Sequence, residues 1–133
     1  MSEAPVADKP TILVVDDEED LRDIMRRMLE RKGYAALTAG DPDEAISVCR
    51  DHPGTIDVLV TDLTLPGEQS GGELAGRIRE MRPGIHVIFI SGLPKDIAVA
   101  KGLVTEDDTL VKKPFTADAL LEAIRRVLGQ EEP

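Results

Sequence analysis

Aromatic residues are scarce in this sequence: one of the 133 residues is Tyr, two are Phe and none is Trp. Hydrophobic residues still make up 41% of the chain, which is enough for a core. At this length, one domain buries about two-thirds of the surface that its unfolded chain exposes. We therefore expect a single domain whose core is built from Ile, Leu, Val and Ala.

The sequence contains one cysteine, Cys49, and so it has no internal disulfide. A lone cysteine in a predicted helix indicates a packing role and a reducing compartment, and we predict a cytoplasmic protein. No apolar run approaches the length of a membrane-spanning helix, and residues 1–10 lack the apolar core of a signal peptide. We predict one domain over residues 10–129, with disordered tails at 1–9 and 130–133.

Basic residues are the minority among the charged ones: 16 Lys and Arg stand against 26 Asp and Glu, for a formal net charge of −10. An excess of negative charge disfavours binding to nucleic acid or to an anionic membrane surface. We predict neither as a partner. The charge suits a basic or mixed protein surface, or a metal cation.

Short apolar runs alternate with helical patterns along the chain. Runs typical of buried strands cover residues 11–15, 34–38, 58–62, 85–90 and 109–111. Helical apolar spacing covers residues 18–32, 42–52, 73–81, 94–101 and 117–128. A β–α unit repeated five times predicts a parallel sheet with helices on both faces. Right-handed crossovers then bring the carboxyl ends of all strands to one edge. Asp41 with Pro42, and Thr116, are expected to begin the second and last helices.

Polar side chains follow the strands at that predicted edge: Asp16, Asp17, Asp62, Ser91 and Lys113. Three carboxylates at close quarters repel one another unless a cation compensates, and carboxylate and carbonyl oxygens with several waters suit Mg²⁺. A carboxylate can also attack phosphorus and form an aspartyl phosphate. Lys113 could then neutralise one phosphoryl oxygen, and Ser91 could donate a hydrogen bond to another.

Each of these residues, taken alone, has a simpler explanation. An acid pair before a helix is often only a cap, and an Asp or a Ser-Gly pair after a strand is often only a turn. A lysine before a proline is usually solvated. Their convergence on one predicted edge is what favours a shared site.

Over residues 10–128 the sequence resembles the receiver domain of two-component response regulators. Four stretches carry the resemblance: Ile12 to Glu18, Thr61 to Gly67, Val87 to Gly92 and Leu110 to Phe115. The resemblance implies an α/β, flavodoxin-like doubly wound (βα)5 fold. Its five-stranded parallel sheet would have the strand order 2-1-3-4-5.

The resemblance also implies roles for the polar residues. Asp62 would accept a phosphoryl group from a sensor histidine kinase or a histidine phosphotransfer protein, and Ser91 and Lys113 would contact that group. A Mg²⁺ ion would be bound directly by the carboxylates of Asp17 and Asp62 and by the main-chain carbonyl of Thr64. Asp16 would act on the ion through water. The Lys113–Pro114 bond is usually cis in such domains. Phosphorylation would switch binding to a downstream protein that the sequence does not name.

Two features depart from the commonest receiver pattern. The position three residues before Lys113 often carries an aromatic residue that reports phosphorylation, and here it is Leu110. The loop at residues 68–72 is one residue longer than in many relatives. This longer loop, together with Ser91-Gly92-Leu93 and the Lys113-Pro114-Phe115 ending, resembles receivers of hybrid histidine kinases and some single-domain regulators. We expect no output domain after Leu128, and therefore a protein that acts alone, passes the phosphoryl group on, or is part of a hybrid kinase.

Two other functions remain open from the sequence. A phosphohydrolase of the haloacid-dehalogenase kind would need a second acid at Thr64 and its motif on the first strand, and so we do not predict a true enzyme. The other alternative is a receiver-like interaction module that is never phosphorylated. The complete set of acids, serine and lysine argues against that module.

Overall fold

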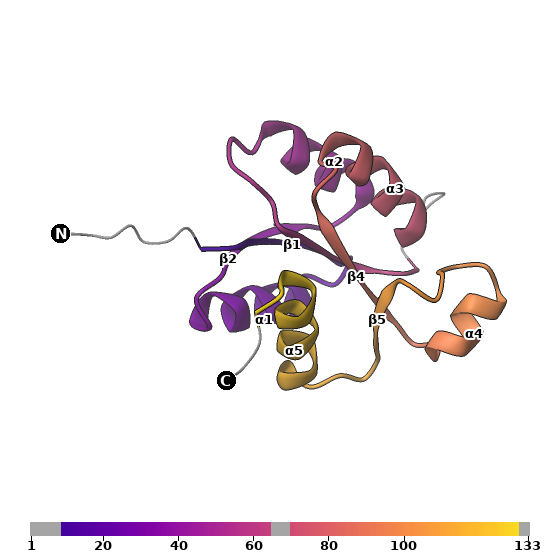
Figure 1. The fold of residues 1–133 in the computed structure, drawn as a ribbon. Coiled ribbons are helices and arrows are strands. Elements are labelled where there is room, and N and C mark those ends of the chain that lie inside the picture. Colours follow the sequence, from indigo (N-terminus) through magenta and orange to yellow (C-terminus); the bar gives the residue numbers. More distant parts are fainter. Residues whose placement is uncertain (1–8, 65–69, 131–133) are drawn as a thin grey trace.

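The structure is a computed structural model that describes residues 9–64 and 70–130, and its strands and helices alternate throughout (Figure 1). In chain order the elements are β1 (Thr11–Val15), α1 (Glu19–Arg31), β2 (Ala35–Ala39), α2 (Pro42–Asp51), β3 (Val58–Asp62), α3 (Gly71–Met81), β4 (His86–Ser91), α4 (Lys95–Ala100), β5 (Thr109–Lys112) and α5 (Ala117–Leu128). The strands form one parallel sheet in the order β2-β1-β3-β4-β5. The predicted flavodoxin-like fold is confirmed.

The sheet separates two apolar clusters, because alternate residues of a strand point to opposite faces. Leu13 and Val15 belong to the cluster that α2, α3 and α4 cover. Ile12 and Val14 belong to the cluster that α1 and α5 cover. Figure 1 shows α2 and α3 on one side of the sheet and α1 and α5 on the other. Both clusters are mainly aliphatic, as the composition predicts.

The predicted helix starts at Asp41 and Thr116 are confirmed. The Asp41 carboxylate accepts a hydrogen bond from the backbone N–H of Glu44 at 2.8 Å, and Pro42 occupies the first helical position. The Thr116 hydroxyl accepts one from the N–H of Ala119 at 3.0 Å. Each bond satisfies one backbone donor that has no partner within the helix.

The predicted start of α3 was wrong. We expected a helix from Glu73, with a polar loop up to Gly72, but the helix begins at Gly71. Ser70 caps it: its hydroxyl accepts from the Glu73 N–H at 3.1 Å, and the Glu73 carboxylate accepts from the Ser70 N–H at 3.0 Å. This reciprocal pair is the S-x-x-E capping box, a pattern that the sequence does contain. The remainder of the expected long loop, up to residue 69, lies outside the described residues.

Two predicted strands were displaced by one residue. The strand expected over 34–38 covers 35–39, and the strand expected over 85–90 covers 86–91. Strand boundaries depend on which residues pair with neighbouring strands, and local composition does not show that pairing.

At the amino-terminal edge of β3 and β4, one arginine joins two helices. Arg82 follows α3, and its guanidinium donates to three main-chain carbonyls that end or follow α2. Nε and Nη2 donate to Cys49 at 3.0 and 2.9 Å, Nη2 also donates to His52 at 2.8 Å, and Nη1 donates to Gly54 at 2.7 Å. Charge-assisted bonds of this kind are the stronger ones in proteins, and so the end of α3 is firmly attached to α2.

The last described residue, Gln130, still contacts the domain. Its N–H donates to the Arg125 carbonyl at 2.8 Å, and its side-chain oxygen accepts from the Tyr34 hydroxyl at 3.1 Å. Residues 1–8 and 131–133 lie outside the described ranges, and the predicted tails and domain bounds stay predictions. Across the described ranges, no helix is both long and apolar enough to cross a membrane.

Candidate functional site

At the carboxyl edge of the sheet, the structure pairs Asp62 with Lys113. Asp62 is the last residue of β3, and Lys113 directly follows β5. The Lys113 ammonium donates to Asp62 Oδ2 at 2.8 Å, and this hydrogen bond raises the pKa of Lys113 above its ordinary value. Lys113 therefore carries a positive charge over the whole physiological range. The Lys113–Pro114 peptide is cis, as the resemblance implied.

The Asp62 carboxylate is held at both oxygens. Oδ1 accepts from the backbone N–H of Thr64 at 3.1 Å, while Oδ2 accepts from Lys113. The side chain is nearly buried, with 8% of the residue exposed. The next peptide is fixed too, because the Leu63 N–H donates to the Ile90 carbonyl of β4 at 2.8 Å. The carboxylate therefore has a defined orientation at the rim of the sheet.

Ser91 lies beside this pair at the end of β4. Its main-chain carbonyl accepts from the Lys113 N–H at 2.7 Å, which places the two residues on neighbouring chain segments. The hydroxyl oxygen is buried and accepts from the Leu93 N–H at 2.9 Å. Because this bond uses the oxygen as acceptor, the hydroxyl proton remains available for donation.

Asp16 and Asp17 follow β1 at the same edge but differ in burial. Asp16 is 1% exposed, and its Oδ1 accepts from the Glu18 N–H at 2.8 Å. Its Oδ2 is buried and has no hydrogen-bond partner in the described part of the chain. Burial raises the pKa of Asp16, and the charges of Asp62 and Asp17 raise it further. Asp17 is exposed.

The donor set fits a small divalent cation. A buried carboxylate oxygen without a partner is uncommon, and a bound ion or water is a usual reason for one. Within the ranges that the structure describes, no group of three or more His, Cys, Asp or Glu side chains is arranged to hold a metal ion by itself. Mg²⁺ needs no such cage, because it binds one or two carboxylates and keeps several waters. The carbonyl of Thr64 was predicted as a ligand. Thr64 is exposed, and it directly follows the buried Leu63.

We expect Asp16→Asn to stabilise the protein against unfolding in EDTA at pH 7. The pKa of Asp16 in the folded protein is raised above its ordinary value of 3.8. The folded state therefore binds the proton of the Asp16 carboxyl group more tightly than the unfolded state does. The stability that this proton contributes is therefore present below about pH 4 and is lost as pH rises through the raised pKa. At neutral pH the ionised, buried carboxylate is destabilising, and Asn removes its charge. A gain of about 1 kcal/mol or more is expected.

The measurement is urea unfolding of both proteins between pH 4 and pH 8. The stability difference should be near zero at pH 4 and should grow as pH rises. Asp17→Asn is the matched control, because it removes a neighbouring carboxylate that is exposed to water. An Asp16→Asn protein that is less stable than the native one at pH 7 would contradict the expectation.

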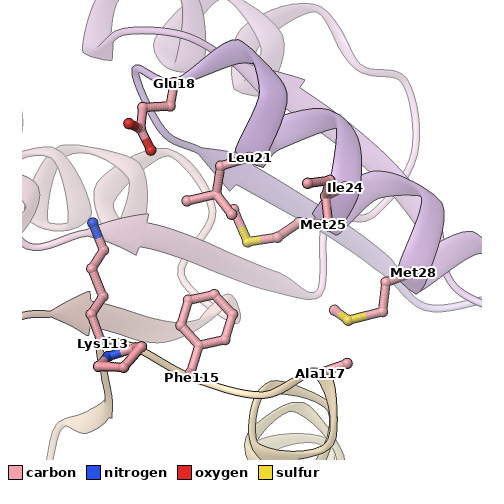
Figure 2. A pocket seen from close by; sticks show the side chains of 9 residues that line it. Glu18, Leu21, Ile24, Met25, Met28, Lys113, Phe115 and Ala117 are labelled. Atoms are coloured by element: carbon pink, nitrogen blue, oxygen red, sulfur yellow. The ribbon is translucent and has the colours of Figure 1, made fainter.

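An apolar groove opens next to Lys113, between α1 and the start of α5 (Figure 2). Its volume is about 570 Å³. The Phe115 ring and the Lys113 stem face Leu21 and Met25 across it, and the Glu18 carboxylate lies on the side of the Lys113 amino group. Ile24 lines the groove and is 62% exposed, although its place in the apolar pattern of α1 suggested burial. The groove could not be predicted from the sequence, because helical spacing does not show which apolar residues a neighbouring element leaves uncovered.

Glycine is required where α3 meets β3. The Gly71 N–H donates to the Leu63 carbonyl at 2.9 Å. A Cβ on Gly71 would lie 2.2 Å from the Asp62 main-chain oxygen and 2.9 Å from the Leu63 Cα. The start of α3 therefore packs directly on the backbone of the residue that carries the central carboxylate.

Comparisons with known proteins agree on one family. The family model for the response regulator receiver domain matches residues 12–125. The chain is 30% identical over 123 residues to the sensor kinase CckA of Brucella abortus (strain 2308), a match that covers 92% of this chain and 13% of that protein. A receiver domain protein from Clostridium thermocellum has a TM-score of 0.77 at 29% identity, with 91% of this chain and 95% of that one covered. The receiver domain of the hybrid histidine kinase CckA has a TM-score of 0.74 at 31% identity, with 89% and 98% covered.

The chain spans between 13% and 53% of the length of the curated relatives that it matches. The likeness is therefore to one domain of those proteins.

Proposed function

The chain belongs to the response regulator receiver domain family, and from this we propose that it is the phosphoacceptor of a two-component phosphorelay. The observation that supports the proposal best is the Asp62–Lys113 ion pair at 2.8 Å, with the Ser91 hydroxyl on the adjacent strand end. This arrangement presents a nearly buried carboxylate, a permanent cation and a free hydroxyl proton at one edge. A phosphorylation switch uses all three.

In the proposed reaction an Asp62 carboxylate oxygen attacks the phosphorus of a phosphohistidine. A new O–P bond forms, the P–N bond breaks, and its electron pair stays on the imidazole nitrogen of the donor. Lys113 exchanges its contact with Asp62 for one with a phosphoryl oxygen, and Ser91 donates to another. Hydrolysis of the acyl phosphate by water would return the free carboxylate.

Mg²⁺ is the proposed cofactor, and it would neutralise phosphoryl oxygens during transfer. The residues proposed to bind it are Asp17, Asp62 and the Thr64 carbonyl, with Asp16 acting through water. The orphaned Asp16 oxygen and the crowding of acids support this set.

Phosphorylation would draw Ser91 toward the phosphoryl group and displace the segment after β4. The aromatic switch of many receivers is absent, because Leu110 occupies that position on β5. Leu110 pairs with Phe89 of β4 and packs against the apolar cluster under α2, α3 and α4. We propose that repacking of this apolar contact takes the place of the aromatic rotation.

The groove between α1 and α5 is proposed to receive the donor protein. It is lined by Lys113 itself, so a protein that delivers a phosphoryl group to Asp62 has to approach next to it. Its apolar lining requires apolar side chains near the donor phosphohistidine. The proposed donor is the predicted sensor histidine kinase or phosphotransfer protein.

We expect Ile24→Glu to slow phosphoryl transfer from a protein donor by roughly tenfold, the size of a typical interface hot spot. The docked donor protein would cover this charge with its apolar side chains, which weakens docking. The position is exposed in the free protein, so folding should remain intact. The measurement is the rate of transfer from a purified phosphorylated kinase core that labels the native protein.

Labelling by acetyl phosphate should remain unchanged in this variant, because a small donor needs no groove. The matched control is Ile97→Glu, because Ile97 is an exposed isoleucine on α4, outside the groove. If Ile24→Glu slowed labelling by the kinase and by acetyl phosphate equally, the defect would lie in the site around Asp62 and not in docking.

The proposed function is tested by intact mass after incubation with acetyl phosphate, with and without Mg²⁺. One added phosphoryl group, seen only with Mg²⁺, is expected. If there is no adduct and beryllofluoride also fails to bind, the chain is a phosphorylation-independent interaction module. Turnover of p-nitrophenyl phosphate would instead favour a phosphohydrolase.

A further inference from the structure

Arg22 on α1 reaches back to the acidic loop after β1. Its Nη1 donates to the Asp16 main-chain carbonyl at 2.7 Å. The side chain is half-buried. None of the roles given above to the acids and to Lys113 uses this residue.

The turn between β2 and α2 also packs closely against the guanidinium. A Cβ on Gly40 would lie 3.0 Å from Arg22 Nη1 and 3.3 Å from its Cζ. Gly40 is itself fixed, because its N–H donates to the Glu44 carboxylate at 2.7 Å. Arg22 therefore occupies a narrow space between two loops, and its contact with Asp16 has little freedom.

The carbonyl that Arg22 holds belongs to the peptide group that joins Asp16 to Asp17. Because a peptide group is planar, fixing its oxygen also fixes the direction in which the chain enters Asp17. The Asp16 side chain holds the other end of this turn through the Glu18 N–H. Asp17 lies between these two anchors, although its own side chain is exposed.

We propose that Arg22 is a positioning residue for the cation: it holds the Asp16–Asp17 peptide so that the Asp17 carboxylate faces the site. The inference rests on the proposed function, because it requires that the acids bind Mg²⁺. A positioning role predicts that removal of Arg22 weakens cation binding. If Arg22 acted only through its charge, its removal would strengthen cation binding, since a nearby positive charge would be lost. If it acted only through packing, its removal would leave cation affinity unchanged.

The test is a titration of the full chain with MgCl₂, followed by the amide NMR signals of Asp17 and Glu18. Arg22→Met keeps the length of the side chain and removes the donor, and we expect its Kd for Mg²⁺ to rise roughly tenfold, as for other residues that orient metal ligands. Arg22→Lys keeps a donor of similar reach and should stay within about threefold of the native value. Arg26→Met removes one positive charge one turn further along α1 and should not weaken binding.

Arg22→Gln, whose amide is too short to reach Asp16, replaces Arg22→Met if the latter does not fold. An Arg22→Met or Arg22→Gln protein that binds Mg²⁺ as well as or better than native would overturn the inference, as would equal weakening in Arg22→Lys. A native protein that shows no Mg²⁺-dependent shift would overturn the proposed cofactor, and the inference with it. These outcomes are distinguishable because the native titration is read first.

Discussion

Replacing Asp62 by Asn is expected to abolish phosphorylation by acetyl phosphate completely. The amide keeps the shape of the side chain and can still accept from the Thr64 N–H, but its oxygen carries no negative charge to attack phosphorus. The variant also leaves Lys113 without its ion-pair partner. Intact mass after incubation with acetyl phosphate and Mg²⁺ should show the unmodified chain only, against one added phosphoryl group on the native protein.

Asp57→Asn is the matched control for this experiment. Asp57 lies just before β3, at the opposite end from Asp62, and its carboxylate accepts from the Thr11 N–H at 2.7 Å. An amide oxygen can accept the same bond, so this variant should fold and be labelled like the native protein. Labelling that survives in Asp62→Asn would show that another residue is the acceptor, and the assignment of the site would be wrong.

Replacing Gly71 by Ala is expected to lower the free energy of unfolding by about 3 kcal/mol, the upper end of the range for overpacking. The added methyl group would lie 2.2 Å from the Asp62 main-chain oxygen, and neither partner is a flexible side chain that can move away. The start of α3 has to separate from β3, and this also displaces the peptide that orients Asp62. Urea unfolding measures the first effect, and the rate of labelling by acetyl phosphate, which should fall, measures the second.

Two other glycines of α3 provide controls. At Gly72 the nearest atoms to a Cβ are 3.5 and 3.7 Å away, and at Gly76 no atom lies within 4 Å. Gly76→Ala should stabilise the protein by about 0.5 to 1 kcal/mol, because Ala is the better helix former. Gly72→Ala should be close to neutral. A Gly71→Ala protein as stable as these two would contradict the close packing of α3 on β3.

Much of the site could be predicted from the sequence, because parallel topology alone brings strand ends together. Asp16, Asp62 and Ser91 each end or follow an apolar run, and Lys113 follows the last one. Once the β–α repeat was recognised, their meeting at one edge required no knowledge of side-chain geometry. The structure adds the pairing of Asp62 with Lys113 and the unpartnered oxygen of Asp16.

What the sequence could not show depends on how the chain folds back on itself over short stretches, or on competing local patterns. The need for glycine at position 71 arises from a backbone that lies nine residues earlier. The contact of Arg22 with Asp16 depends on how α1 returns over the loop, and a charged residue on a helix normally suggests only a solvated face. The start of α3 was mispredicted for a different reason, because two local patterns competed. The sequence contains the capping box, but the two glycines after Ser70 favoured a loop.

Helix α3 is anchored at both ends. Gly71 joins its start to the backbone of β3, and Arg82 joins its end to carbonyls in the last turn of α2 and after it. A rod fixed at both ends resists displacement along its axis, so it can serve as the stationary frame against which other elements move. Helix α4 is the contrast: it has six residues, no side-chain cap at its start and one buried residue, Ala98. Within the described residues, α4 therefore lacks a pair of anchors like those that hold α3. Under the proposed function, a partner that senses phosphorylation would detect it at α4, with α3 as the fixed reference.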